Sequence, residues 1–470
     1  MMVLEKMVRG RENDAPAKQL AQCWEHDAGT LAFWRASSNF VYTLDIGGKR
    51  HFLRFVHEAD NGLESIQAEL EFMLYLSERG YPTVAPVRSS NGRLIETVRA
   101  DSGRYHGVVF EQARGKPLTH DCMTDLQLEE WGESLARLHG LSESYGRSAP
   151  ASARRSWQDV LRFVSEELRR HPGTSGPLRE LERLRVRLSE LPVGEGRTGW
   201  IHYDFQADNL FYVAEESRYC AIDFDDSMIH WYQMDIASAL ADLFEEDTDE
   251  AERRIRHFLA GYRKVRALDE DDLERIPLFR TFDDLYRLAR LLRSIEGMNG
   301  VSKPDWLPGL HRKLTEMSDR IIARYSPTVE LRPVDANNWY DCSQLEVTEE
   351  QRGVFPVSIV YWLAESAYCG FTPLAVYASE ELVGFAAYAV DPDDGSYWIM
   401  AFMIDVGHQG RGFGRAGMKE LIRLIRETHG CDRIRLGHRP GNEVAARLYA
   451  SLGFEEVGAD DGEIIRELRF

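Results

Sequence analysis

Three polar side chains lie close together in a stretch that is otherwise apolar. Asp204, Asn209 and Asp223 fall within "WIHYDFQADNLFYVAEESRYCAIDFDD", residues 200–226, whose short apolar runs predict β-strands. Mg2+ prefers hard oxygen ligands, so Asn209 and Asp223 could hold a magnesium-bound nucleotide. Asp204, five residues before the asparagine, could accept the proton of an attacking hydroxyl group. The spacing therefore favours transfer of a phosphoryl group to a hydroxyl.

Other polar residues of this stretch have more than one reading. A buried aspartate near a histidine is more often structural than catalytic. The prediction of phosphoryl transfer therefore depends on the combined spacing of Asp204, Asn209 and Asp223. We expect His202 to hold the loop by hydrogen bonds rather than to act as an acid or base. Asp225 and Asp226 could help at the metal or cap the turn, and capping is favoured for Asp226.

A second candidate site is the glycine-rich loop "QGRGFG", residues 409–414. The loop follows the strand-like "WIMAFMID" and opens a helix, so its N–H groups and the positive helix end could bind a pyrophosphate. Gly410, Gly412 and Gly414 would allow close approach of the backbone. A dinucleotide-binding loop is disfavoured, because the order here is Q-x-x-G-x-G instead of G-x-G-x-x-G.

The surrounding periodicity predicts two domains that position these sites. Short strands and one helix are expected between residues 31 and 114, and mostly helices from residue 124 onward. The helical region ends at Pro327, and the strands "PLAVYA", "LVGFAAYAV" and "YWIMAFMID" come later. We therefore expect one domain over residues 1–327 and a second over residues 328–470.

Composition restricts the classes of partner. The chain is 43% hydrophobic and 29% charged, which indicates a folded globular protein. Its formal charge of −20 argues against nucleic acid or an anionic membrane as a partner and suits a cationic small molecule. The isolated cysteines predict reduced thiols, and no apolar run approaches the ~20 residues of a membrane span. A cytoplasmic location is expected.

The first motif resembles a known group of enzymes. His202-x-Asp204-x4-Asn209 followed by "AIDFDD" resembles the catalytic segment of the aminoglycoside phosphotransferase and choline-kinase-like families, over roughly residues 20–325. The resemblance implies a bilobal protein-kinase-like fold that uses ATP and Mg2+. It makes Arg54, in "HFLRFV", the cation that grips the phosphates, and Glu69 its ion-pair partner.

The same resemblance places further nucleotide contacts. "WRASSNFVYTL" matches the hairpin that covers the phosphates, with Ser37, Ser38 and Asn39 as backbone or side-chain donors. "VVFEQARGKPL" matches the hinge that binds adenine. GxGxxG, HRD and DFG motifs are absent, which argues against a eukaryotic-type protein kinase.

The second motif resembles the GCN5-related N-acetyltransferase (GNAT) family. After Q-x-x-G-x-G comes "GNEVAARLYASLGFEEVG", with the family's N-x-x-A-x-x-L-Y-x-x-x-G-F pattern, and the finer likeness is to the spermine/spermidine acetyltransferase branch. Acetyl-CoA is implied, and Tyr449 would protonate the departing thiolate. The implied cofactor contacts are Met403, Ile404, Gln409, Gly410, Arg411, Gly412, Gly414 and Asn442.

Together these observations predict an α+β chain with a kinase-like domain followed by a GNAT domain with a central mixed sheet. We expect a bifunctional enzyme that phosphorylates a hydroxyl and acetylates an amine, such as that of a polyamine or aminoglycoside. Two alternatives remain open: a single-activity acetyltransferase with a kinase-like binding domain, and a non-catalytic sensor of polycations. Acceptor identity, the GNAT general base and oligomeric state do not follow from the sequence.

Overall fold

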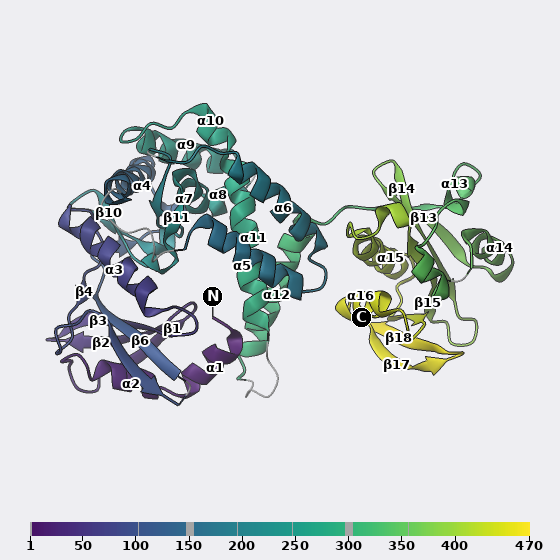
Figure 1. Ribbon diagram of the computed structural model, residues 1–470, viewed down its shortest axis with the longest axis horizontal. Coiled ribbons are helices and arrows are strands. Elements are labelled where there is room, and N and C mark those ends of the chain that lie inside the picture. Colours follow the sequence, from purple (N-terminus) through teal and green to yellow (C-terminus); the bar gives the residue numbers. More distant parts are fainter. Residues whose placement is uncertain are drawn as a thin grey trace. The chain divides into compact units, whose positions relative to one another are not determined.

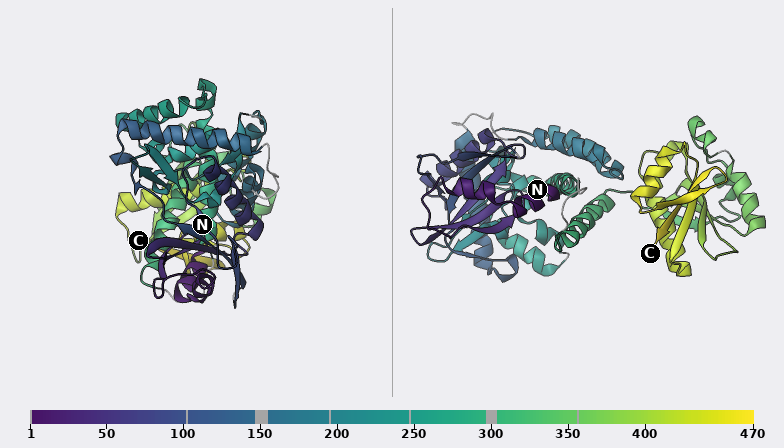
Figure 2. Two further views of the ribbon diagram at one scale, coloured as in Figure 1. Left: turned by 90° about the vertical axis from the view of Figure 1, so that its left-hand side faces the viewer. Right: turned by 90° about the horizontal axis from the view of Figure 1, so that it is seen from below.

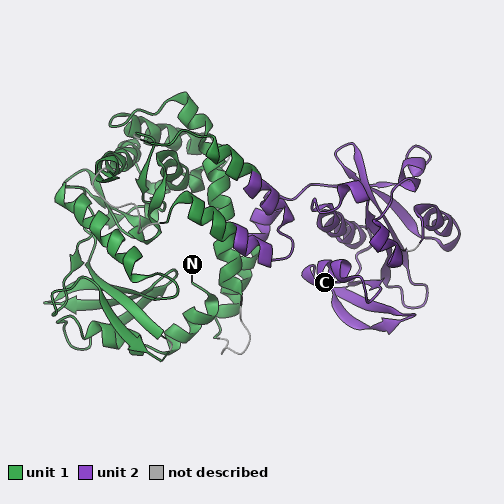
Figure 3. Ribbon diagram, in the orientation of Figure 1, with its two compact units in different colours: residues 1–164, 183–317 green, residues 165–182, 318–470 purple. Residues whose placement is uncertain are grey.

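The computed structural model describes residues 2–101, 103–146, 155–194, 196–246, 248–296, 304–355 and 357–470. The chain forms two compact units, residues 1–164 with 183–317, and residues 165–182 with 318–470 (Figure 3). The expected boundary at residues 327/328 lies between helix α12 (Leu307–Arg324) and strand β12 (Glu330–Pro333). That boundary stays a prediction, because compactness groups residues 318–327 with the second unit.

The first unit begins with an antiparallel sheet, seen at the lower left of Figure 1. Its order is β1-β2-β3-β6-β4, and β5 also pairs with β6. Helix α2 covers one face of this sheet, where Leu20 packs with Leu44, Leu53 and Phe55. The elements here are α1 (Leu4–Glu12), α2 (Ala15–Ala21), β1 (Ala32–Ala36), β2 (Phe40–Ile46), β3 (Lys49–His57), α3 (Leu63–Glu78), β4 (Pro86–Val87), β5 (Glu96–Ala100) and β6 (Gly103–Glu111).

The alternation of side chains along β3 directs Arg54 away from the core that packs against α2. Leu53 and Phe55 are buried on the face that packs against α2. Because neighbouring side chains of a strand point to opposite faces, Arg54 projects to the other side. Helix α3 follows, with Ile66, Leu70 and Glu69 buried. The sheet and α3 therefore bring Arg54 and Glu69 to the same place.

The rest of the first unit is mostly helical, with short strands that hold the polar loops. β8 (Thr198–Ile201) pairs with β11 (Met228–Trp231), and β9 (Leu210–Val213) lies between β10 (Arg218–Ala221) and β7 (Lys116–Pro117). The helices along this part of the chain are α4 (Asp125–Gly146), α5 (Trp157–Arg170), α6 (Ser175–Ser189), α7 (Tyr232–Ala239), α8 (Ala241–Glu245), α9 (Asp249–Arg263), α10 (Glu270–Glu274), α11 (Ile276–Ile295) and α12. Of these, α5, α6 and α12 are divided between the two compact units. Among the described residues no helix is both long and apolar enough to span a bilayer.

His230 on β11 is a fully buried histidine in an aromatic environment. Its ring lies 4.5 Å from Phe282 and 5.7 Å from Phe279, centroid to centroid. Nδ1 accepts the N–H of Trp231 at 2.9 Å, so Nε2 carries the proton of the neutral ring. Burial lowers the pKa of His230 from 6.5 to about 3. The folded protein therefore keeps this ring uncharged at every moderately acidic pH.

We expect acidification to destabilise the first unit partly through His230. Below pH 6.5 the unfolded chain takes up a proton that the folded chain refuses until about pH 3, so the free energy of unfolding falls across this window. One such group contributes up to about 1.4 kcal/mol per pH unit. Urea unfolding of His230→Phe should show a shallower loss of stability between pH 6.5 and 4.5 than the unaltered protein. Parallel losses in the two proteins would contradict this assignment.

The second unit contains a mixed sheet of order β12-β13-β14-β15-β16-β18-β17. Among the described pairings of this sheet, only β15–β16 is parallel. Its elements are β12, α13 (Trp339–Ser343), α14 (Ile359–Cys369), β13 (Thr372–Ala378), β14 (Glu381–Val390), β15 (Tyr397–Ile404), α15 (Phe413–His429), β16 (Arg433–His438), α16 (Glu443–Ser451), β17 (Glu455–Asp460) and β18 (Glu463–Arg469).

Helices cover both faces of this sheet, with α15 on one side and α14 on the other (Figures 1 and 2). Met418 and Leu421 of α15 pack against a face that carries Ile399. Ile359 of α14 packs against the opposite face, which carries Phe385 and Met403. Period-two alternation in β14 and β15 thus supplies both layers of the core.

An irregularity in β15 opens the sheet. Met400 is skipped in the register with β14, where Ala401 pairs with Ala387 and Ile399 pairs with Tyr388. Such a bulge bends its strand. β15 pairs with β16 only from Tyr397 to Ile399, and among the described pairings the stretch beyond Ile399 has no partner on that side. A gap between two neighbouring strands follows.

Candidate functional sites

Asp204, Asn209 and Asp223 meet at the ends of short strands. Asp204 follows β8, Asn209 ends the 3-10 turn Ala207–Asn209, and Asp223 follows β10. The Asn209 amide Nδ2 donates to the Asp204 carboxylate at 2.9 Å and to the Asp204 carbonyl at 3.0 Å. The Asn209 carbonyl in turn accepts the N–H of Ile222, the residue before Asp223, at 3.0 Å. The structure therefore brings the three predicted residues together.

A buried aspartate, Asp235 on α7, holds the loop that carries Asp204. Its carboxylate accepts the backbone N–H of His202 at 2.8 Å and that of Tyr203 at 2.5 Å. It also accepts from Nε2 of His139 at 3.0 Å. Tyr203 adopts a left-handed backbone conformation, with φ of 71°, which is sparsely populated for a non-glycine residue. Asp235 thus stabilises a strained turn directly before Asp204.

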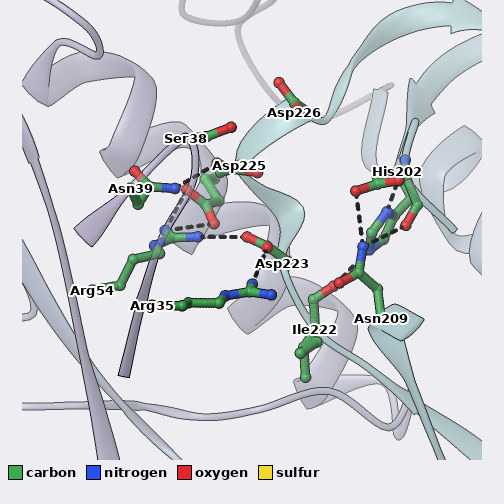
Figure 4. Close-up of polar contacts among 12 residues, drawn as sticks. Arg35, Ser38, Asn39, Arg54, His202, Asn209, Ile222, Asp223, Asp225 and Asp226 are labelled. Atoms are coloured by element: carbon green, nitrogen blue, oxygen red, sulfur yellow. Dashed lines mark hydrogen bonds and ion pairs between the residues drawn. The ribbon is translucent and has the colours of Figure 1, made fainter. Parts of the chain in front are cut away.

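His202 has the structural role expected for it. Its Nδ1 accepts the N–H of Asp204 at 3.2 Å, and its Nε2 donates to the carbonyl of Ile222 at 2.9 Å (Figure 4). Burial lowers the pKa of His202, so the neutral ring matches this pair of contacts. The histidine therefore ties the loop of Asp204 to the segment that leads into Asp223.

Asp204 is poised to act as a base near neutral pH. Burial, together with the charges of Asp226 and Asp208, raises its pKa to about 7. A general base works best when its pKa lies near the operating pH. The hydrogen bond from Asn209 orients one carboxylate oxygen and leaves the other for an acceptor hydroxyl.

Asp223 lies between the two lobes of the first unit. Its backbone is left-handed, with φ of 65°, and its carboxylate is 2.9 Å from Nη2 of Arg35 and 3.5 Å from Nη1 of Arg54 (Figure 4). Burial raises its pKa. A divalent cation would find carboxylate oxygens here, and the Asn209 amide would offer its Oδ1, since its Nδ2 is bound to Asp204. The donors fit Mg2+.

Arg54 and Glu69 form the predicted ion pair. Arg54 Nη2 lies 2.7 and 2.8 Å from the two oxygens of Glu69, whose side chain is fully buried. Arg54 also stacks over the Phe110 ring at 5.0 Å. Helix α3 therefore fixes the guanidinium between Glu69 and Asp223, where it could contact a phosphate.

The hairpin between β1 and β2 contacts the same acidic segment. Asn39 Nδ2 donates to the Asp225 carboxylate at 2.6 Å, and Ser38 Oγ accepts from Nη2 of Arg290 at 3.1 Å. Burial and the neighbouring carboxylates Asp223 and Asp226 raise the pKa of Asp225 to about 7. Ser38 and Asn39 thus lie at the site as expected.

We expect Asn39→Ala to lower the free energy of unfolding by about 1.5 to 3 kcal/mol, because it removes a hydrogen bond to a buried carboxyl group. Asn39 is buried and Ser37, in the same hairpin, is exposed, so Ser37→Ala is the matched control. The control should stay within about 0.5 kcal/mol of the unaltered protein. Urea unfolding at pH 7.5 measures both, and equal stabilities of the two variants would show that the contact with Asp225 is not formed.

A pocket of about 410 Å³ adjoins Arg54 and Asp223. Apolar side chains form most of its walls, as in many sites for aromatic ligands. The segment Glu111–Ala113, within the expected adenine-binding hinge, also lines this pocket. Further lining residues include Val41, Phe52, Met73, Val84, Phe110, Phe211 and Ile222.

Comparison with known proteins agrees with this geometry. Residues 31–268 match the family described as the phosphotransferase enzyme family. The chain belongs to the phosphotransferase enzyme family. Amicoumacin kinase of Bacillus subtilis (strain 168) is 23% identical over 299 residues, which are 60% of this chain and 86% of that protein. The solved structure of the amicoumacin kinase hAmiN, in complex with AMP-PNP, Ca2+ and Ami, superposes with a TM-score of 0.56 at 24% identity. That superposition covers 67% of this chain and 96% of the other, and it shows the fold alone.

The gap beside β15 is the second candidate site of this phosphotransferase-family protein. The backbone of Met403 and Ile404 lies on the strand segment that has left β16. Gln409 Nε2 donates to the Ile404 carbonyl at 2.9 Å, so the glycine-rich loop is fastened to that strand. Gly410 and Gly412 have φ of 72° and 86°, which glycine adopts readily. Helix α15 begins at Phe413, which leaves its first N–H groups at the loop.

The remaining predicted cofactor contacts, Arg411, Gly414 and Asn442, differ in how they lie relative to the glycine-rich loop. Gly414 lies in the first turn of α15, and the Arg411 guanidinium stacks on Phe413 at 5.2 Å. Asn442 caps α16, since its side chain accepts the N–H of Ala445 at 3.1 Å. The Asn442 side chain is thus engaged within the protein. The loop, the strand and the helix end fit a pyrophosphate and an extended chain such as that of acetyl-CoA.

Tyr449 lies on α16 within the core of the second unit. Its ring is 5.9 Å from His438 and 6.1 Å from Phe454, centroid to centroid. Burial raises the pKa of Tyr449 to about 12, with a smaller effect from the charge of Glu463. The phenol is therefore fully protonated at neutral pH and can donate a proton. His438 is the last residue of β16, the strand that borders the gap.

Relatives of the second unit agree with these features. Residues 335–454 match the family described as the acetyltransferase (GNAT) family. Spermine/spermidine N(1)-acetyltransferase of Bacillus subtilis (strain 168) is 30% identical over 141 residues, 28% of this chain and 92% of that protein. The predicted fold class, a kinase-like fold followed by a GNAT domain, is confirmed. The protein is a transferase, and its two domains imply a nucleotide and acetyl-CoA as donors.

Three residues of the first site had no prediction from the sequence. Asp235, Arg35 and Arg290 contact the predicted residues from distant segments. Asp235 carried a weak signal, as one of two carboxylates in the mostly apolar segment "MDIASALADLF". Arg35 and Arg290 are single arginines among many, and nothing in their spacing indicates this role.

Proposed function

We propose that the chain is a bifunctional small-molecule-modifying enzyme. The first unit would transfer a phosphoryl group from ATP to a hydroxyl, and the second would acetylate an amine with acetyl-CoA. The observation that carries the first activity is the assembly of Asp204, Asn209 and Asp223 next to the Arg54–Glu69 pair. A binding domain without catalysis would not need an oriented carboxylate with a pKa of about 7.

Each residue has a distinct part in the proposed phosphoryl transfer. Asp204 would accept the hydroxyl proton of the acceptor. Arg54, held by Glu69, would bind phosphate oxygens in the pocket. Asn209 Oδ1 and Asp223 would hold Mg2+, which supplies charge neutralisation on the phosphates when bound.

In the second unit, Tyr449 would give its proton to the departing thiolate, since its phenol is buried and neutral. Gly410, Gly412 and the start of α15 would bind the pyrophosphate. The amine acceptor would be a polyamine or an amino sugar. The name of the relative of this unit, a spermine/spermidine acetyltransferase, supports the first of these classes.

The purified full-length chain should be incubated with a panel of hydroxylated and amino compounds. One reaction receives ATP and Mg2+, one receives acetyl-CoA, and products are identified by mass. The proposal expects a gain of one phosphate in the first reaction and of one acetyl group in the second. Acetylation without ADP formation on any acceptor would favour the single-activity alternative. Binding of polyamines without either product would favour a sensor.

A further inference from the structure

A second, smaller pocket lies beside the catalytic loop of the first unit. It encloses about 200 Å³ and draws its walls from parts of the chain that are far apart in sequence. One wall is the hairpin of Ser38 and Asn39, and another is Asp225 and Asp226. The other lining residues are Met2, Val56, Asp60, Asn61, Arg155, Phe163, Tyr286, Arg290 and Arg293.

Three arginines and three aspartates line this pocket. Arg290 lies 2.7 Å from one carboxylate oxygen of Asp226, and Arg155 lies 3.9 Å from the other. Arg293 is 3.6 Å from Asp60, but Asp60 already pairs with Lys6 at 2.7 Å. A protein with a formal charge of −20 thus places three arginines in one small cavity.

Among the contacts of the described residues, Arg155 makes only two with side chains of the pocket. Its Nη1 donates to the Tyr286 hydroxyl at 3.3 Å, and its contact with Asp226 is too long for a hydrogen bond. Half of its side chain, 49%, is exposed, whereas Arg290 is 20% exposed. Its guanidinium group therefore retains donors that a ligand in the pocket could use.

Two residues of the pocket, Asp226 and Arg290, act electrostatically on the proposed base Asp204. They therefore lie close to the carboxylate that would receive the acceptor's proton. The proposed nucleotide pocket is a separate one, because Asp223 lines it and the second pocket is lined by Asp225 and Asp226. This arrangement favours the acceptor, rather than the nucleotide, as the ligand of the smaller pocket.

We propose that this pocket binds a carboxylate of the phosphate acceptor, with Arg155 as its principal donor. The inference rests on the proposed phosphotransfer and narrows its substrate to hydroxylated carboxylic acids. A planar guanidinium matches a carboxylate geometrically, and Arg155 is half exposed and lies 3.9 Å from the carboxylate of Asp226. A free dianion is disfavoured, because Asp226 keeps its own negative charge beside Arg290.

The test compares two acceptors that differ by one carboxylate. L-Homoserine and 3-aminopropan-1-ol share the hydroxyl, the amine and the carbon spacing between them. We expect kcat/KM for homoserine to exceed that for aminopropanol by tenfold or more. In Arg155→Gln this ratio should fall about tenfold, as expected when a charge-assisted hydrogen bond is lost. The matched control is Arg162→Gln on α5, whose side chain is 70% exposed and outside the pocket, and it should keep the ratio.

Calorimetry of homoserine binding gives a second readout that needs no turnover. Binding that weakens in Arg155→Gln and persists in Arg162→Gln supports the proposal. Three results would overturn it. The first is equal kcat/KM or equal affinity for the two acceptors, and the second is a homoserine-to-aminopropanol ratio of kcat/KM that Arg155→Gln leaves unchanged. The third is that homoserine does not bind. If no acceptor of any kind leads to ADP formation, the proposed phosphotransfer fails, and the calorimetric comparison still decides whether the pocket takes a carboxylate.

Discussion

Asp204→Asn should abolish phosphoryl transfer while acetyl transfer continues at nearly its original rate. Removal of a positioned base typically lowers the rate by ~10²- to 10⁴-fold. The amide has the shape of the carboxylate, so the loop held by Asp235 should keep its conformation. The proposed acetyl-transfer site lies in the second unit, which has a hydrophobic core of its own.

ADP and acetylated product, measured on the same preparation, test this prediction. Acetyl transfer serves as the internal control for folding and concentration. Nucleotide affinity, measured by calorimetry, should change little, because Arg54 and Asp223 remain. Full phosphoryl transfer by Asp204→Asn would mean that the aspartate only supports the loop.

Tyr449→Phe should lower kcat of acetyl transfer by ~10²-fold or more, as expected for loss of a general acid. The substitution removes one oxygen and keeps the ring that packs against Phe454. Acetyl-CoA affinity and melting temperature should therefore change little. If Tyr449 only packs the core, kcat stays constant instead, and the loss of stability is at most roughly 0.5 to 1.5 kcal/mol.

Tyr388→Phe is the matched control for this experiment. Tyr388 is buried in the same core cluster, and its hydroxyl contacts Nε2 of His429 at 3.1 Å. It should lose stability without loss of kcat. An unchanged kcat in Tyr449→Phe would mean that the thiolate takes its proton from elsewhere, most simply from water.

The local sequence pattern predicted the helices and strands, and it predicted site residues that are close to one another in the sequence. Asp204 and Asn209 are five residues apart on one loop, so their contact follows from the sequence. Arg54 and Glu69 lie on a strand and the next helix, and the family resemblance supplied their pairing. Both domains could be recognised in this way.

Long-range contacts could not be predicted, because they depend on packing. Asp235 is 33 residues from His202, and Arg290 is 64 from Asp226. The bulge at Met400 had no signal either, since "YWIMAFMID" reads as an uninterrupted strand. The expectation of a cationic acceptor came partly from the average charge, and an average does not describe how arginines and aspartates are placed around one pocket.

The bulge at Met400 leaves part of one edge of β15 unpaired, among the described strands, when no acetyl-CoA is bound. From Ala401 to Ile404, β15 has β14 on one side and no strand partner described on the other. Backbone groups on that side resemble the free edge of a sheet, which tends to recruit a further strand. We therefore expect slow self-association and fast amide hydrogen exchange at this edge in the empty protein. An extended ligand lying along it would suppress both, as an added strand would.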